Sequence, residues 1–202
     1  MASKDRLEDS LVPDHASVIR HTRTYSCPIF DVFDDEIRLE NSDHSIHRMY
    51  MEHPDAVGIL AVRDSPEDPG NHDVLMIRQY RHPLHTMHWE FPAGLCDHEG
   101  ESALAAAQRE LSEETGYQAQ HMEPLVRYAS SPGCSTEVLT VFLATELHPV
   151  ASSFVREDEE AEIEQRWIPL AQARNAVLAG KLISPSVCVG LMAFCTKTGI
   201  VE

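Results

Sequence analysis

The sequence lacks the features that mark fibrous, low-complexity or membrane-spanning chains. Its 202 residues include 9 glycines and 12 prolines, ordinary counts that exclude a collagen-like repeat. No apolar run approaches the roughly 18 residues of a membrane-spanning helix. The charged start MASKDRLEDS has no apolar signal core, so we expect neither a leader nor a membrane partner. With 43% hydrophobic residues, the chain has material for one compact domain or two small lobes.

Paired cysteines are also missing. The five cysteines lie far apart, form no CxxC motif, and are odd in number: Cys27, Cys96, Cys134, Cys188 and Cys195. A complete disulfide framework is therefore excluded. The pattern is typical of a soluble protein of a reducing compartment, and we expect a cytoplasmic one.

Positive charge is scarce. Lys and Arg number 16 against 33 Asp and Glu, which gives a formal net charge of −17. This balance argues against a nucleic-acid-binding surface and makes divalent cations natural partners. Solubility alone accounts for the total equally well, so charge by itself assigns no function.

Short apolar runs separated by turn-forming residues are plentiful. Residues 1 to about 20 are polar and predict a loose arm or a peripheral element. The runs after it predict strands in the segments YSCPIFDVF, SIHRMYM, AVGILAV, DVLMIRQY, HWEFPAG, MEPLVRYA, EVLTVFLATEL and EIEQRWIPL. Two terminal helices are indicated by apolar stripes at Leu170, Ala173, Val177 and Leu178 and at Val187, Leu191 and Phe194. This mixture predicts an α/β layer fold.

A central helix between Glu101 and Thr115 carries an unusual amount of negative charge. Its core-facing stripe is expected to comprise Leu104, Ala107 or Gln108, and Leu111. Three glutamates gather in its last turns, where the helix dipole makes negative charge least favourable: Glu110, Glu113 and Glu114. The penalty of about 1–2 kcal/mol is tolerable for a solvated acidic face. Bound Mg²⁺ or Mn²⁺ would reverse its sign, because carboxylates are hard oxygen ligands for these ions.

The same stretch resembles the signature of the Nudix hydrolases. The matching residues are Gly94, Glu101, Arg109, Glu110, Leu111, Glu113, Glu114, Gly116 and Tyr117. The segment between Gly94 and Glu101 is one residue longer than in the family pattern, and we expect a bulged turn there before an intact helix. The segments QYRHP, WEFPAG and SPGCSTE further resemble the ADP-ribose pyrophosphatase subgroup.

This resemblance implies an architecture. It predicts a Nudix α/β/α sandwich with a mixed sheet in residues 53–202, the catalytic domain. It also predicts an antiparallel β region within residues 1–52 that contributes to a homodimer.

The resemblance also implies roles for individual residues. Metal contacts fall to Glu110, Glu113, Glu114 and the carbonyl of Ala93, while Arg109 orients the glutamates. Substrate contacts fall to Arg81, Glu90, Gly94 and Pro132. A general base is expected at Glu159 or Glu160, within the acidic run REDEEAEIE. Two of these assignments have simpler alternatives. Glu90 could form an ion pair with Arg81 instead of contacting substrate, and the acidic run could be a solvated loop instead of supplying the base.

The implied reaction is Mg²⁺-dependent hydrolysis of ADP-ribose to AMP and ribose 5-phosphate. Alternatives are another nucleoside diphosphate sugar or dinucleotide as substrate, a non-catalytic ADP-ribose-binding regulator, or an acidic interaction domain. Candidates for an adenine-stacking surface are Tyr25, Phe30 and Phe33, although the sequence favours a core position for each of them. The cluster of His82, His85 and His88 lacks a zinc-site spacing, so no zinc is expected there.

Overall fold

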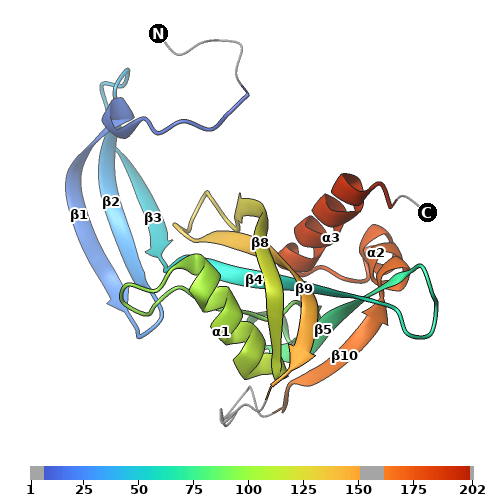
Figure 1. Ribbon diagram of the computed structural model, residues 1–202. Helices are drawn as coiled ribbons and strands as arrows, with labels where there is room; N and C mark the ends of the chain where they lie inside the picture. The colour runs from blue at the N-terminus through green and yellow to red at the C-terminus, as the bar shows by residue number, and fades with distance from the viewer. Residues whose placement is uncertain (1–6, 151–161, 201–202) are drawn as a thin grey trace. The chain divides into compact units, whose positions relative to one another are not determined.

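The computed structural model describes residues 7–150 and 162–200, and the chain divides into two compact units. The smaller unit comprises Met1–His53 together with Gly133–Ser135. The larger unit comprises Pro54–Pro132 and Thr136–Glu202. Each unit holds a sheet of its own (Figure 1).

The smaller unit is a three-stranded antiparallel sheet in the order β1-β2-β3. Its elements are η1 (Pro13–His15), β1 (Ala16–Ser26), β2 (Asp31–Leu39) and β3 (Ile46–Glu52). From Ala16 onward the segment is a peripheral element rather than a loose arm, because main-chain pairing with β2 stabilises it as the edge strand β1. The run YSCPIFDVF is likewise interrupted by a turn, in which Cys27 N donates to Phe30 O over 3.1 Å.

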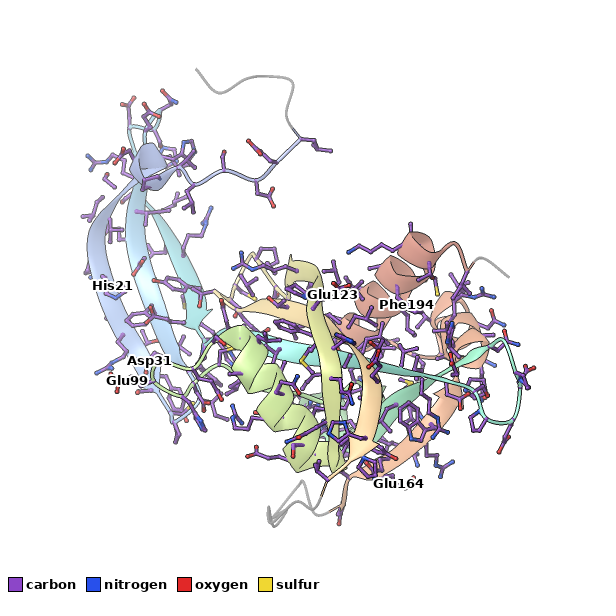
Figure 2. All side chains as sticks on the ribbon, viewed as in Figure 1. His21, Asp31, Glu99, Glu123, Glu164 and Phe194 are labelled. Atoms are coloured by element: carbon purple, nitrogen blue, oxygen red, sulfur yellow. The ribbon has the colours of Figure 1, made fainter. Side chains whose placement is uncertain are left out.

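Phe33 forms the centre of a small core in this unit. It is 7% exposed, and its ring stacks on His21 at a centroid distance of 4.2 Å and on Tyr50 at 5.8 Å. The buried Asp35 carboxylate contacts His21 Nδ1 at 2.6 Å and accepts from Tyr50 Oη at 3.2 Å; Figure 2 marks His21 on this sheet. Phe33 is thus a packing residue, and its suggested role as an adenine platform is wrong because protein rings already cover it. Tyr25, by contrast, is 59% exposed.

The larger unit is built on a seven-stranded mixed sheet with the central order β10-β5-β4-β9-β8. Strand β6 pairs with β5 and β7 pairs with β4. The pair β4–β9 is parallel, and the other pairs in this sheet are antiparallel. The strands are β4 (Ala56–Asp64), β5 (His72–Arg81), β6 (Thr86–Glu90), β7 (Ala93–Leu95), β8 (Tyr117–Ala129), β9 (Val138–Pro149) and β10 (Glu164–Pro169), and η2 (His82–Leu84) lies between β5 and β6.

Helices cover both faces of this sheet. Alternate residues of β4 separate the two cores: Val57, Ile59 and Ala61 pack with α1 (Ala103–Thr115), while Leu60 and Val62 pack with α2 (Leu170–Leu178) and α3 (Pro185–Thr198). Figure 1 shows the strands passing between α1 and the other two helices. The predicted α/β/α sandwich is confirmed. No helix within the described residues is long and apolar enough to cross a membrane.

Three local expectations for this unit are wrong. The segment HWEFPAG forms two strands, since Phe91 and Pro92 carry the chain from its pairing with β5 to a new pairing with β4. Leu104 and Leu178 are 45% and 65% exposed rather than core residues. The buried face of α1 keeps the expected Ala107 and Leu111 and adds three residues to them: Ala106, Glu114 and Thr115.

Candidate functional site

The ends of α1 are fixed by its own sequence. The Ser102 side chain accepts a hydrogen bond from Ala105 N at 3.2 Å and caps the first turn. Gly116 ends the helix at φ +72°, a left-handed conformation that favours glycine, and its N–H donates to Ser112 O. The helix begins at Ala103, two residues later than expected, so Glu101 precedes it. The caps hold the acidic last turns in place against the sheet.

Glu114 is the most buried carboxylate of this helix. Its side chain lies against the sheet, the residue is 7% exposed, and Oε2 accepts a hydrogen bond from Ala93 N at 2.9 Å. Ala93 itself is held in register opposite Gly58 of β4. A buried carboxylate needs such donors to offset the loss of water. This hydrogen bond therefore connects the last turn of α1 to the first residue of β7.

Glu110 approaches the same stretch of backbone, one residue further along. An ideal Cβ placed on Gly94 would overlap the carboxyl group of Glu110. Gly94 is paired with Val57 and does not have a positive φ, so close approach of the carboxylate explains the glycine. Ala93 and Gly94 together form a backbone cradle for two carboxylates.

Arg109 supplies the positive charge of this cluster. Its Nη1 donates to Glu110 Oε1 at 2.6 Å and to Glu113 Oε2 at 3.2 Å. Its Nε and Nη2 donate to the two oxygens of Glu101 at 3.1 and 3.0 Å, and Nη2 also reaches Leu95 O at 3.3 Å. These hydrogen bonds hold the pKa of Glu101 below its ordinary value and raise the pKa of Arg109. The arginine thus links the loop glutamate to the helix glutamates.

The longer loop between Gly94 and Glu101 is accommodated by a turn. Cys96 N donates to Asp55 O at 2.8 Å, and Glu101 N donates to His98 O at 3.1 Å. Gly100 lies within this turn at φ +77°. The expected turn before an intact helix is confirmed, and Glu101 remains within reach of Arg109.

The donor types in this cluster fit a hard divalent cation. Three glutamates and the Ala93 carbonyl are oxygen ligands of the kind that Mg²⁺ prefers, and Gly94 leaves room for one of them. Among residues 7–150 and 162–200, no three His, Cys, Asp or Glu side chains already converge as a metal-holding group. Arg109 Nη1, itself a cationic group, lies between Glu110 and Glu113. Ligation of an ion by both glutamates therefore requires their carboxylate oxygens to turn away from Arg109 Nη1.

A second cluster is centred on Glu90 at the end of β6. Arg81 forms a bidentate pair with it, Nε to Oε1 at 3.0 Å and Nη2 to Oε2 at 2.6 Å. Gln79 Nε2 donates to Oε2 at 3.2 Å, and both Gln79 and Glu90 are 8% exposed. The pairing of Glu90 with Arg81 is thus present. Gln79 was missed from the sequence, although its position two residues before Arg81 on one strand puts both side chains on one face.

Of the remaining sequence-predicted site residues, the structure describes Pro132. Pro132 is exposed in the turn that follows β8. Glu159 and Glu160 fall outside the described residues. Only Phe91 and Pro92 separate the Glu90 cluster from Ala93, so one short segment of chain carries parts of both clusters.

Comparison with known proteins gives four related findings. The NUDIX domain family matches residues 52–185. An ADP-ribose pyrophosphatase of Mycobacterium tuberculosis is 36% identical over 165 residues, 82% of this chain and 76% of the relative. Another ADP-ribose pyrophosphatase, from Bacillus subtilis, is 34% identical over 160 residues, 79% of this chain and 81% of that protein. A crystal structure of an ADP compounds hydrolase superposes on this chain with a TM-score of 0.73, covering 96% of this chain and 100% of that one. The two sequences are 22% identical, so the match shows a likeness of fold.

Proposed function

The chain belongs to the Nudix family, and from this we propose that it hydrolyses the pyrophosphate bond of ADP-ribose to AMP and ribose 5-phosphate with the help of Mg²⁺. The observation that carries the proposal is the convergence of Glu110 and Glu114 on the Ala93–Gly94 backbone. A helix that only needed stability would place cations in its last turn.

The proposed metal ligands are Glu110, Glu113, Glu114 and the carbonyl of Ala93. A divalent ion there, Mg²⁺ or Mn²⁺, would neutralise the diphosphate and make water a stronger nucleophile. Arg109 holds Glu110 and Glu113 near the ion-binding position by donating to both. When these glutamates turn toward an ion, Arg109 keeps its hydrogen bonds to Glu101 and remains beside the site as a second source of positive charge.

Arg81 and Glu90 are the proposed substrate contacts next to this cluster, with Gly94 and Pro132. The Glu90 carboxylate fixes the guanidinium of Arg81 in a planar, two-bond geometry. An arginine held in this way is suited to an anionic phosphate group, because its remaining N–H groups keep a fixed direction. The proposed base, Glu159 or Glu160, would accept the proton of the attacking water.

A substrate panel with product identification tests the function. ADP-ribose, other nucleoside diphosphate sugars and dinucleotides are incubated with the protein and Mg²⁺, and products are identified by mass. We expect the highest kcat/KM for ADP-ribose, with AMP and ribose 5-phosphate as products. A higher kcat/KM for another diphosphate would reassign the substrate, and tight binding of ADP-ribose without turnover would indicate a regulator.

The proposed homodimer rests on residues 1–52. Six large apolar side chains on or beside the three-stranded sheet are exposed, and a second copy of the chain would cover them: Val18, Ile19, Tyr25, Ile29, Leu39 and Met49. Sedimentation of the wild type should give the mass of two chains, and Ile19→Glu should shift it toward one. A wild type that sediments as one chain at micromolar concentration would contradict the dimer. A cytoplasmic setting is also proposed, supported by five cysteines that form no disulfide.

A further inference from the structure

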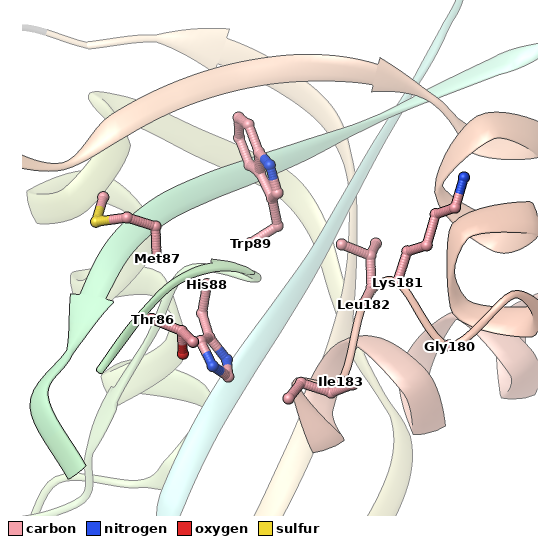
Figure 3. Close-up of a pocket in the computed structure, with 8 residues that line it drawn as sticks. All are labelled: Thr86, Met87, His88, Trp89, Gly180, Lys181, Leu182 and Ile183. Atoms are coloured by element: carbon pink, nitrogen blue, oxygen red, sulfur yellow. The ribbon is translucent and has the colours of Figure 1, made fainter. Parts of the chain in front are cut away.

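A cavity of about 220 Å³ lies along the edge of β6, apart from the acidic cluster of α1. Its walls include Thr86, His88 and Trp89 from β6 and Lys181, Leu182 and Ile183 from the segment between α2 and α3. Figure 3 shows the Trp89 and His88 side chains leaving β6 in opposite directions, with Leu182 and Ile183 across from the strand. The cavity is therefore a slot between a strand edge and a turn.

The turn that forms the far wall has a fixed shape. Gly180 adopts φ +67°, and the N–H groups of Lys181 and Leu182 both donate to Ala176 O, at 2.8 and 3.3 Å. These bonds close the end of α2 in the way a glycine-terminated helix commonly ends. A wall held by main-chain hydrogen bonds is preorganised, so little ordering cost opposes binding there.

The charge around the slot is opposite to that of the whole chain. Lys181 is the charged residue of the lining, which contains no carboxylate. Beside it, the guanidinium groups of Arg78 and Arg166 lie 5.9 and 5.5 Å from the ring centre of Trp89. These two arginines share one carboxylate, Glu164, at 3.6 and 3.2 Å. In a chain with a net charge of −17, this cluster favours an anionic ligand.

One ring nitrogen of His88 is buried and lacks a hydrogen-bond partner among the described residues. The residue is 9% exposed, and this nitrogen is Nε2. Its Nδ1 lies 3.8 Å from Glu90 Oε1, which is beyond hydrogen-bond distance. An orphaned buried ring nitrogen is costly in either tautomer, and a hydroxyl group, which can both donate and accept, relieves it. Thr86 supplies a further hydroxyl at the same wall.

We propose that this slot is a second ligand site, which binds a compact phosphate monoester carrying a hydroxylated sugar. Lys181 takes the phosphate, His88 and Thr86 take hydroxyl groups, and the faces of Trp89, Leu182 and Ile183 pack against the carbon skeleton. The cavity is smaller than the roughly 300–1,000 Å³ of typical drug-sized sites, which suits a single sugar phosphate and excludes an intact dinucleotide. Binding at this slot does not depend on the proposed hydrolysis.

The two tryptophans of the chain make the site directly observable. Trp167 contacts Arg63 and Tyr117 on the other face of the sheet, so Trp167→Phe leaves Trp89 as the single indole emitter. Ribose 5-phosphate is titrated into this variant in EDTA without nucleotide, so that no metal draws phosphate to the acidic cluster. We expect a saturable change in Trp89 emission with a Kd on the order of 1 mM or lower, as for other ligands with few atoms. Ribose and inorganic phosphate, tested separately, should each bind at least about tenfold more weakly.

Two surface substitutions in the same background decide the location. Lys181→Gln should raise the Kd for ribose 5-phosphate at least about fivefold, and Ile183→Phe, which adds no indole, should fill the slot and abolish saturation. Lys197→Gln makes the same charge change on α3 and should leave the Kd unchanged. The proposal is overturned by an absence of saturable change, by equal Kd values in Lys181→Gln and Lys197→Gln, or by inorganic phosphate binding as tightly as ribose 5-phosphate. Because no turnover is measured, these outcomes are independent of the hydrolytic activity.

Discussion

Gly94 and Glu110 are in direct contact: the carboxyl group of Glu110 occupies the space that a Cβ on residue 94 would fill. Gly94→Ala should therefore displace Glu110 from the cradle without straining the backbone. We expect kcat for ADP-ribose to fall about 100-fold, since small displacements of positioned groups have effects of this size. The measurement is the steady-state rate at saturating Mg²⁺, with the melting temperature as the control for folding.

Gly58→Ala is the matched control for that variant. Gly58 lies opposite Ala93 in the neighbouring strand, and a Cβ there meets other atoms at an ordinary 3.5 Å. Its rate should stay within about twofold of wild type. Equal losses in the two variants would mean that general packing, rather than the position of Glu110, determines activity.

Loss of either cradle carboxylate should abolish turnover while the fold persists. Glu114→Gln retains an oxygen that can accept from Ala93 N, so the buried contact survives and only the charge is lost. We expect Glu110→Gln and Glu114→Gln to lower kcat/KM at least about 100-fold. Glu99→Gln removes a carboxylate from an exposed loop position, marked in Figure 2, and should have no effect. Full activity in either cradle variant would remove that residue from the metal assignment.

Arg109 offsets the repulsion among the glutamates that it joins. Arg109→Met leaves Glu101, Glu110 and Glu113 without their shared donor and should reduce the free energy of unfolding by about 1–3 kcal/mol in EDTA. Mg²⁺ should restore more stability to this variant than it adds to wild type, because it replaces the missing positive charge. Thermal unfolding with and without Mg²⁺ measures both quantities. Equal Mg²⁺ effects on the two proteins would place the ion away from Arg109.

The hydrogen bonds from Arg109 also predict a pH dependence of stability. They lower the pKa of Glu101 from its ordinary value of 4.5, so the folded state binds this proton less readily than the unfolded state. The stabilisation is complete above pH 4.5 and is lost as the pH falls through the lowered pKa. Melting temperatures of wild type and Glu101→Gln should differ at pH 7 and converge toward pH 3. A constant difference across that range would contradict the assigned cause.

The proposed base is tested by comparing two adjacent glutamates. Glu159→Gln and Glu160→Gln should differ strongly in kcat, with the base variant reduced about 100-fold or more and the other close to wild type. The pH–rate profile of the impaired variant should lose its acidic limb. If both variants retain wild-type kcat, the acidic run has no part in the chemistry.

The sequence predicts the larger unit well because its strands and helices have strong periodicity. The continuous apolar run at 56–62 and the glutamate spacing of α1 are sufficient to predict a layered fold with an acidic helix. The change of pairing partner at Phe91 and Pro92, from β5 to β4, was not predictable. The choice of a strand's partner depends on tertiary packing. Leu104 and Leu178 were placed in the core for a similar reason: periodicity identifies a helical face but not how closely it approaches its neighbours.

The site was predictable in residue identity but not in its connections. The sequence motif includes Glu101 and Arg109, but it does not predict the two hydrogen bonds between them. These bonds depend on the turn around Gly100, which brings Glu101 to Arg109. The role of Gln79 beside Glu90 depends on the pairing of β5 with β6, which has no signature in the local sequence. The slot beside His88 joins segments nearly a hundred residues apart, and it is found only from coordinates.

Direct binding of a divalent ion tests the central claim most closely. Mn²⁺ is titrated into the protein with a nonhydrolysable ADP-ribose analogue, and free Mn²⁺ is followed by electron paramagnetic resonance. The account predicts that wild type removes Mn²⁺ from solution stoichiometrically, and that the doubly substituted Glu110→Gln/Glu114→Gln protein, folded by its melting temperature, binds at least about 100-fold more weakly. Equal Mn²⁺ binding by the two proteins would contradict the claim that the carboxylates gathered at Ala93 and Gly94 hold the metal.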